Sequence, residues 1–246
     1  MARATQISGT GPDNRSALEA ALDKAIRVPS PVIRAHVDRL TARNPEASAE
    51  QILALLDKEF LRIVTSTGAA VGAAAAVPAV GTATAAALTV SDLAAFFAAS
   101  AAYTLAVADV HGIAVDDVER RRALVLATVL GDDGTAALTT AGISPVAWGR
   151  VLAAAAPSNT IKRVNKVLTG RFLKRYLAKQ SGLALGRLVP FGVGAAVGAI
   201  GGRALAKGVV RQATGAFGPP PLRVGEPVRV VEQAAHASAP RQVEGA

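Results

Sequence analysis

An almost uncharged run of small residues, residues 63–110, constrains the fold of this chain more than any other feature. No charged residue stands between Arg62 and Asp92, and Asp92 is the only charged residue before Asp109. Each half of the run is about as long as a bilayer-spanning helix, which takes ~20 residues at a rise of about 1.5 Å. The run therefore predicts a helical hairpin that is either inserted in a membrane or deeply buried.

Small aliphatic residues also dominate the composition as a whole. Of the 246 residues, 51% are hydrophobic but only 4% are aromatic, which favours closely packed helices over a β-sandwich. We predict an all-α fold, a helical bundle around a central Ala- and Gly-rich hairpin. The predicted organisation is a flexible arm at residues 1–15, one helical domain at residues 16–217 and a Pro-rich disordered tail at residues 218–246.

The sequence lacks cysteine and a secretory signal, and these two absences limit the possible chemistry and the expected compartment of the protein. The chain contains no cysteine, which excludes disulfides, thiolate metal sites and cysteine catalysis. Its N-terminal residues include Arg3, Asp13 and Arg15 and lack the apolar segment of a secretory signal. We therefore expect the N-terminus to be cytoplasmic.

Two stripes of glycine predict how the long helices pack. Inside a helix, glycine costs about 1 kcal/mol relative to alanine, so a glycine stripe needs a closely packed partner. The first stripe lies in the uncharged run, and the second repeats in steps of four over residues 182–202, with Pro190 in one of its places. We predict that the second stripe packs on the first. The predicted packing residues are Gly68, Gly72, Gly186, Gly194, Gly198 and Gly202.

Cap and breaker signals predict where the helices begin and end. Ser16, Asn44 and Ser91 each precede a helical pattern and belong to the residue types that accept a hydrogen bond from the first helical turn. Pro78 and Gly81 weaken the helix in the first half of the uncharged run. A kink or a tight turn is therefore expected there.

Membrane insertion and burial in a bundle both remain open for this hairpin. Residues 63–91 rely on Ala with Thr, Gly and Pro, so this stretch would insert only marginally alone, and better when paired with residues 93–110. Basic residues flank the pair, including the three arginines at 120–122, which would place Asp92 at the far tip. An acidic residue at that depth is costly unless the tip reaches water.

The positive charge of the chain is concentrated in its second half. Residues 134–225 contain 13 basic residues and no acidic one, a surface that attracts anionic lipid head groups, nucleic acid or an acidic partner. We do not expect nucleic acid, because only Phe172 and Tyr176 could stack on bases nearby and no recognition motif is present. The predicted lipid- or partner-binding residues lie on a basic amphipathic helix and are Lys162, Arg163, Lys166, Arg171, Lys174, Arg175 and Lys179.

One cluster of the sequence contains the residue types of an enzyme site, namely Asp109, His111, Asp116, Asp117 and Glu119. A carboxylate two residues from a histidine can orient it or share a metal, whereas acids at helix ends also act as caps. A hydrolase that uses Asp109 and His111 is therefore the enzymatic alternative. No phosphate-binding glycine loop and no GxSxG motif is present, and we expect no cofactor and no metal.

The order of several motifs resembles the EcsC family in an actinobacterial-type version. The resemblance covers roughly residues 44–220, with Asp92 and Gly112 at the positions of a family acid and glycine. It departs from the family at Ala102, where a basic residue is expected, and at Arg203, near a usual Asn. The family is named for a component encoded beside a bacterial ABC transporter linked to secretion, and it implies no assigned activity. The motifs are GAAVGAAAAVPAVGTA, Ser-Asp-Leu, VHGI, DDVERRR and RLVPFGVGAAVGAIGG.

These observations together predict a non-enzymatic protein associated with the cytoplasmic membrane and facing mostly the cytoplasm. Its expected partners are anionic lipid head groups and, by the family resemblance, a membrane transport complex. The alternatives are a soluble helical adaptor that binds an acidic partner and a hydrolase with an Asp/His site.

Overall fold

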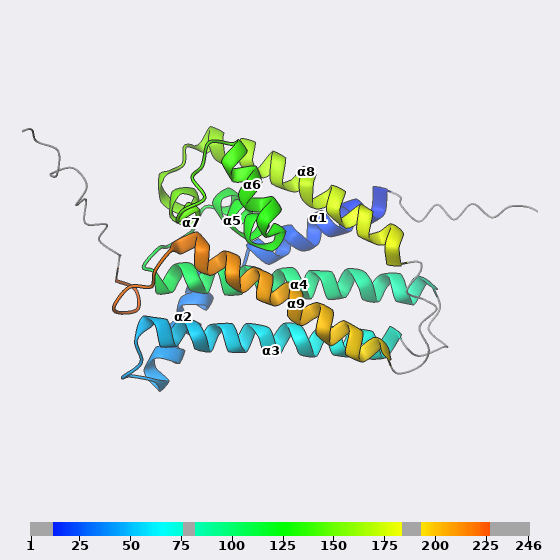
Figure 1. Ribbon diagram of the computed structural model, residues 1–246, viewed down its shortest axis with the longest axis horizontal. Helices are drawn as coiled ribbons and strands as arrows, with labels where there is room; N and C mark the ends of the chain where they lie inside the picture. Colours follow the sequence, from blue (N-terminus) through cyan, green and yellow to red (C-terminus); the bar gives the residue numbers. More distant parts are fainter. Residues whose placement is uncertain (1–11, 76–81, 184–192, 227–246) are drawn as a thin grey trace, which may run out of the picture.

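The computed structural model describes residues 12–75, 82–183 and 193–226 (Figure 1). Over these residues the chain contains helices and no strand, so the predicted all-α fold is confirmed. The elements are α1 (Pro12–Ile26), α2 (Ser30–Arg43), α3 (Ala49–Ala75), α4 (Thr82–Val110), α5 (Val118–Leu130), α6 (Asp132–Thr140), α7 (Trp148–Arg150), the π-helix η1 (Val151–Ala155), α8 (Ser158–Leu183) and α9 (Val193–Phe217).

Helix α4 is the centre of the bundle. It contacts α1, α2, α3, α5 and α9, and its residues between Phe97 and Val110 supply much of the buried core. Figure 1 shows α2 and α3 on one side of α4 and α5, α6 and α8 on the other. Helix α4 therefore separates the surface formed by α2 and α3 from the surface formed by α5, α6 and α8.

Helix α9 packs along α3 in the most extensive contact between described elements. This is the pairing that the two glycine stripes predict. At Gly202 a Cβ atom would lie 3.0 Å from the carbonyl oxygen of Val64, so the two backbones approach closely there. Gly186 lies outside the described residues, and the side-chain surroundings of Gly72, Gly194 and Gly198 are likewise outside them, while Gly68 is half-buried on α3.

The sequence predicts that Asn44 caps the start of α3, and this prediction is wrong. Asn44 lies at the end of α2 instead. Its backbone N–H and its side-chain amide donate to carbonyl oxygens of the last turn of α2, at 2.9 and 2.8 Å. Helix α3 begins after a capping box instead, in which Ser48 Oγ accepts from the N–H of Gln51 at 3.3 Å and Gln51 Oε1 accepts from the N–H of Ser48 at 2.9 Å. Asn44 and Ser48 are both cap residues, but only Ser48 has a glutamine three positions later.

Two other predicted boundaries are also wrong. Helix α1 begins at Pro12, before the predicted cap Ser16, because proline is well suited to the first helical turn. Helix α4 continues through Ser91 and Asp92 without a break, since this pair costs only tenths of a kcal/mol inside an otherwise Ala-rich helix. Asp92 is therefore not at the tip of the hairpin, and the connection between α3 and α4 comes earlier in the chain.

The predicted disordered tail begins with a folded segment. Gly218 has a φ of +74°, which turns the chain at the end of α9. The N–H of Gly225 donates to the carbonyl oxygen of Val110 at 3.0 Å, and Pro221 is buried. Residues 218–226 therefore belong to the bundle, whereas residues 227–246 lie outside the described residues.

Among the described residues, one stretch is long and apolar enough to cross a membrane, Leu93–Val110 in α4. Inside the bundle 56% of this stretch is buried. The core helix of a globular protein can have the same length and composition.

Candidate functional site

His111 is a buried residue at the end of α4, and it does not face an acidic partner. The residue is 2% exposed, its Nδ1 donates to the carbonyl oxygen of Val107 at 2.8 Å, and its ring packs on Phe217 with centroids 5.5 Å apart. Burial lowers its pKa, hydrogen bonds to the backbone of Val107 and Gly218 act in the opposite direction, and the charge of Arg150 lowers it further. His111 therefore joins the ends of α4 and α9.

Asp109 pairs with α2 rather than with His111. Its Oδ1 lies 3.6 Å from Nε of Arg34. Burial raises the pKa of Asp109, the Arg34 charge and hydrogen bond lower it, and the nearby Asp38 raises it. The Asp109–His111 pair that the hydrolase alternative requires is not formed.

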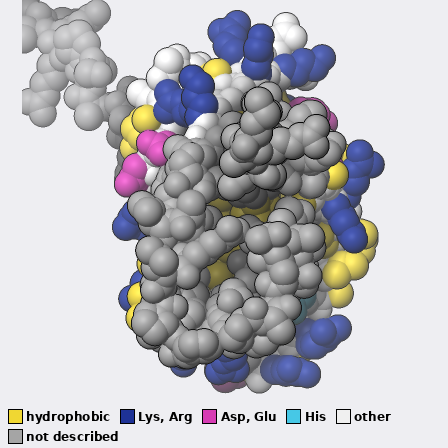
Figure 2. Space-filling model, turned by 90° about the vertical axis from the view of Figure 1, so that its right-hand side faces the viewer, with side chains coloured by type: hydrophobic (Ala, Val, Ile, Leu, Met, Phe, Trp, Pro, Cys, Tyr) yellow, Lys and Arg dark blue, Asp and Glu magenta, His cyan; other side chains and the backbone are white. Residues whose placement is uncertain are grey.

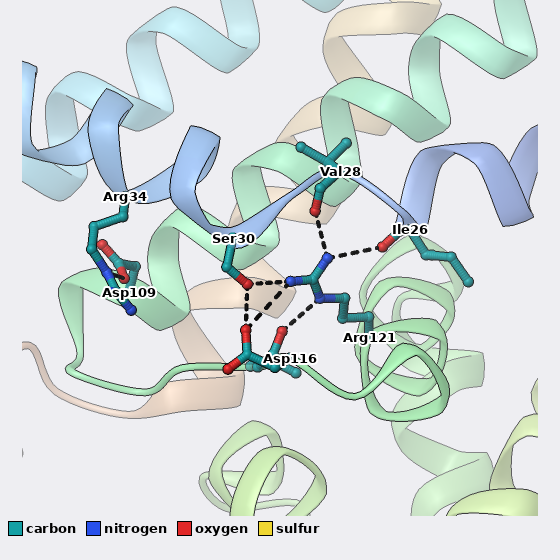
Figure 3. A network of polar contacts seen from close by, with 8 residues as sticks. Ile26, Val28, Ser30, Arg34, Asp109, Asp116 and Arg121 are labelled. Carbon is teal, nitrogen blue, oxygen red and sulfur yellow. Dashed lines mark hydrogen bonds and ion pairs between the residues drawn. The ribbon is translucent and has the colours of Figure 1, made fainter.

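Asp116 belongs to a network around the buried Arg121 (Figure 3). Arg121 is only 5% exposed, and its guanidinium group donates to the carbonyl oxygens of Ile26, Val28 and Val115. It also donates to Ser30, whose hydroxyl group donates to Oδ1 of Asp116, and the carboxylate lies 3.8 Å from the guanidinium. The network ties the connection between α1 and α2 to the connection between α4 and α5.

Asp117 and Glu119 also have structural partners. Asp117 is the N-cap of α5, because its Oδ1 accepts from the N–H of Arg120 at 2.8 Å. Glu119 Oε2 accepts from Nδ2 of Asn165 at 2.8 Å and so ties α5 to α8. No group of acidic or histidine side chains that could hold a metal exists in the described parts of the chain. The predicted cluster is thus distributed among separate structural contacts.

The arginines on either side of Arg121 are used inside the bundle as well. Arg120 donates from Nη1 and Nη2 to the carbonyl oxygens of Leu152 and Ala156 at 2.8 and 2.9 Å. Arg122 Nη1 lies 3.4 Å from Oδ1 of Asp23 on α1. This arginine triplet therefore contributes contacts within the bundle.

Helix α8 presents a basic face to solvent. Its buried side packs on α5 and α6 through residues that include Ile161, Val164 and Leu168. Arg171 is half-buried and donates to the carbonyl oxygen of Asp133 at 2.8 Å. The side chains of the predicted Arg175 and Lys179 lie outside the described ones. The exposed residues, which we call the α8 basic face, are Lys162, Arg163, Lys166 and Lys174.

The α8 basic face has no acidic counterpart. None of its four residues forms an ion pair or a hydrogen bond through its side chain with another described residue. Figure 2 shows Lys and Arg side chains around the outline of one end of the molecule, with fewer Asp and Glu side chains among them. Exposed cations without partners can bind an anionic surface without first breaking internal contacts.

An apolar groove of about 600 Å³ lies between α2, α3 and α4. Each helix contributes side chains at helical spacing, and α4 contributes Ala99, Ala102 and Ala106, whose small side chains leave the space open. Val32 on α2 and Ile63 on α3 line the groove and are 58% and 44% exposed. Large exposed apolar side chains at a concave surface mark a binding site more often than isolated ones do.

Polar groups gather at one part of this groove. His36 Nε2 on α2 lies 3.0 Å from Glu59 Oε2 on α3, so this pair links the two helices at the groove. Arg39, one turn beyond His36, also lines the groove, and it is exposed and has no ion pair with any residue in the described ranges. Arg39 is thus the unpaired cation of the groove.

Tyr103 fixes the inner wall of the groove. Its ring stacks on Phe60 with centroids 4.6 Å apart, and its hydroxyl group donates to Oδ1 of Asp57 at 2.6 Å. Burial raises the pKa of Asp57, and the Tyr103 hydrogen bond opposes this rise. Burial and the Asp57 carboxylate raise the pKa of Tyr103. Tyr103 is therefore a neutral donor that holds α4 against α3.

Sequence reasoning missed this groove. In the sequence, Ala102 stands out only as a departure from the resembled family. A signal was present in the spacing of Ala99, Ala102 and Ala106 beside the bulky Tyr103 on one helix, but the hollow depends on how α2 crosses the other two helices.

No family model, curated protein or solved structure matches this chain. The resemblance to the EcsC family therefore stays a prediction that rests on the order of the sequence motifs.

Proposed function

We propose that the protein is a helical accessory component at the cytoplasmic face of the membrane and that it binds anionic lipid head groups through the α8 basic face. The observation that carries the proposal is the exposure of these four basic side chains without a partner among the described residues. A basic residue near an anionic leaflet contributes about 1 kcal/mol to membrane binding. The surrounding sequence adds to the attraction, because residues 134–225 contain no acidic side chain.

The burial of α4 supports attachment to the membrane surface over insertion. Protein side chains already cover 56% of the apolar stretch Leu93–Val110, and a bilayer is not needed to shield that part from water. The resemblance to the EcsC family suggests a transport or secretion complex as the membrane partner. No enzymatic activity is part of the proposal, because Asp109 and His111 have separate structural contacts.

Vesicle binding tests this function. We expect the full-length protein to bind vesicles that contain phosphatidylglycerol and to bind pure phosphatidylcholine vesicles at least tenfold more weakly. Replacing the four residues of the α8 basic face by Gln should weaken binding to the anionic vesicles by at least tenfold. The matched control replaces four exposed basic residues elsewhere by Gln and removes the same charge; these are Lys24, Arg43, Lys58 and Arg62.

The control variant distinguishes vesicle binding by the α8 basic face from attraction by the net charge of the protein. The proposal requires that the control variant keeps most of its vesicle affinity. Equal losses in the two variants would show a general charge effect and overturn the assignment to α8. Unchanged binding of the α8 variant would do the same, and an absence of vesicle binding by the unmodified protein would favour the alternative of an adaptor for an acidic protein.

A further inference from the structure

The apolar groove between α2, α3 and α4 is a second surface that the proposed function does not use. Figure 1 shows α2 and α3 on the opposite side of α4 from α8, so the groove and the α8 basic face do not overlap. Its volume of about 600 Å³ lies within the range of about 300–1,000 Å³ found for small-molecule sites. A ligand of the groove is therefore separate from the lipid head groups proposed for the α8 basic face.

The walls of the groove indicate an occupant with an apolar body. Three alanines of α4, at positions 99, 102 and 106, line one side, and Phe60 and Ile63 line the side formed by α3. Polar side chains are confined to His36, Arg39 and Glu59 and to the hydroxyl group of Tyr103, which is already bonded to another residue. An unbranched hydrocarbon chain matches such a surface because it requires no hydrogen-bond partner.

The charges of the groove indicate an anionic end for this occupant. Glu59 is occupied by His36 at 3.0 Å, which leaves the guanidinium group of Arg39 as the uncompensated charge. Arg39 lies two helical turns from the exposed Val32, a distance of about 10 Å along α2. The guanidinium group of Arg39 and the exposed apolar side chain of Val32 thus lie at different ends of the part of α2 that lines the groove. A guanidinium group binds a carboxylate through two parallel hydrogen bonds.

We propose that this groove binds a long-chain fatty acid, with its hydrocarbon chain along the alanines of α4 and its carboxylate at Arg39. The inference is independent of membrane binding through α8, because no groove residue belongs to the α8 basic face. Each methylene group that enters the groove raises the affinity roughly fourfold. Arg39 adds selection for an acid over the alcohol of the same chain length.

Binding of palmitate to the full-length protein tests the hydrocarbon part of this proposal. Ala102→Phe fills the groove and should weaken palmitate binding at least tenfold. Ala98→Phe is the matched control, because Ala98 is exposed on the same helix and does not line the groove; it should bind palmitate like the unmodified protein. Should Ala102→Phe fail to fold, as judged by circular dichroism, the smaller Ala99→Leu replaces it, with the same direction expected.

Hexadecanol tests the head-group part. Arg39→Gln should weaken palmitate binding roughly fivefold and leave hexadecanol binding unchanged, whereas Arg43→Gln, an exposed arginine of α2 outside the groove, should change neither. Undiminished palmitate binding in the groove-filling variants would overturn the proposal. The absence of palmitate binding by the unmodified protein would also overturn it. The same holds if the groove-filling variants lose self-association and keep palmitate binding.

Discussion

At the scale of single residues, arginines connect the helix ends of this bundle. Arg120 donates to carbonyl oxygens of η1 and its following residue, Arg121 to those at the end of α1, and Arg150 Nε to the carbonyl oxygen of Phe217 at 2.7 Å, where α9 ends. The last carbonyl groups of a helix lack partners within the helix, and cations complement its dipole there. Part of the positive charge of the sequence is therefore used internally and is not available to a partner.

Arg121 is the arginine whose loss should cost most. In Arg121→Met the carbonyl oxygens of Ile26, Val28 and Val115 lose their shared donor, and we expect the free energy of unfolding to fall by about 3 kcal/mol. Urea denaturation followed by circular dichroism measures this change. Arg211→Gln is the comparison, because the Arg211–Asp132 pair is 3.8 Å long and exposed on both sides; it should cost less than about 1 kcal/mol. Similar losses in the two variants would contradict a special role for Arg121.

At the scale of elements, the contact between α3 and α9 depends on where glycine removes a side chain. Gly202 faces the carbonyl oxygen of Val64, so a methyl group there would crowd the backbone of α3. Gly208 lies about two turns later on α9, and a Cβ atom added there would have open space around it, with no neighbouring atom within 4 Å. The two glycines are thus chemically identical but have different surroundings, which makes them a matched pair.

This pair predicts different effects of the same substitution. Gly208→Ala should raise the free energy of unfolding by roughly 0.5–1 kcal/mol, because alanine is the better helix former. Gly202→Ala should bring no gain, and Gly202→Leu should lower it by about 2–3 kcal/mol through overpacking against α3. Urea titrations of the three variants provide the comparison. A gain of the same size in both alanine variants would show that α9 does not approach α3 closely at Gly202.

The elements also show what could be predicted from the sequence. Helix type and the pairing of α9 with α3 follow from residue composition and from glycine spacing, which are properties of one segment at a time. The start of α3 is harder to predict because Asn44 and Ser48 are both caps, and the choice depends on Gln51. The acidic residues near His111 do not form one site with it, because Asp109 and Glu119 take their partners, Arg34 and Asn165, from other helices.

At the scale of the whole molecule, the helices that carry the two candidate surfaces, α8 for the basic face and α2 and α3 for the groove, lie on opposite sides of α4 (Figure 1). The α8 basic face is polar and is proposed to bind a membrane surface, whereas the groove is apolar and is proposed to hold a single hydrocarbon chain. A bundle arranged in this way can contact lipid head groups with one side while the other side remains accessible. Its central helix is covered by protein over more than half of the apolar stretch Leu93–Val110.

The proposed binding through the α8 basic face predicts how the protein is released from isolated membranes. Binding through exposed lysines and arginines is screened by salt, because the Debye length shrinks from about 10 Å at 0.1 M to about 3 Å at 1 M ionic strength. We therefore expect high salt or alkaline carbonate to release the protein from isolated membranes, as measured by immunoblotting of pellet and supernatant. The variant without the α8 basic face should appear in the supernatant before the wash. Retention in the pellet after carbonate, with release only by detergent, would instead mean that α3 and α4 insert in the bilayer and that the side chains now packed around α4 move away from it.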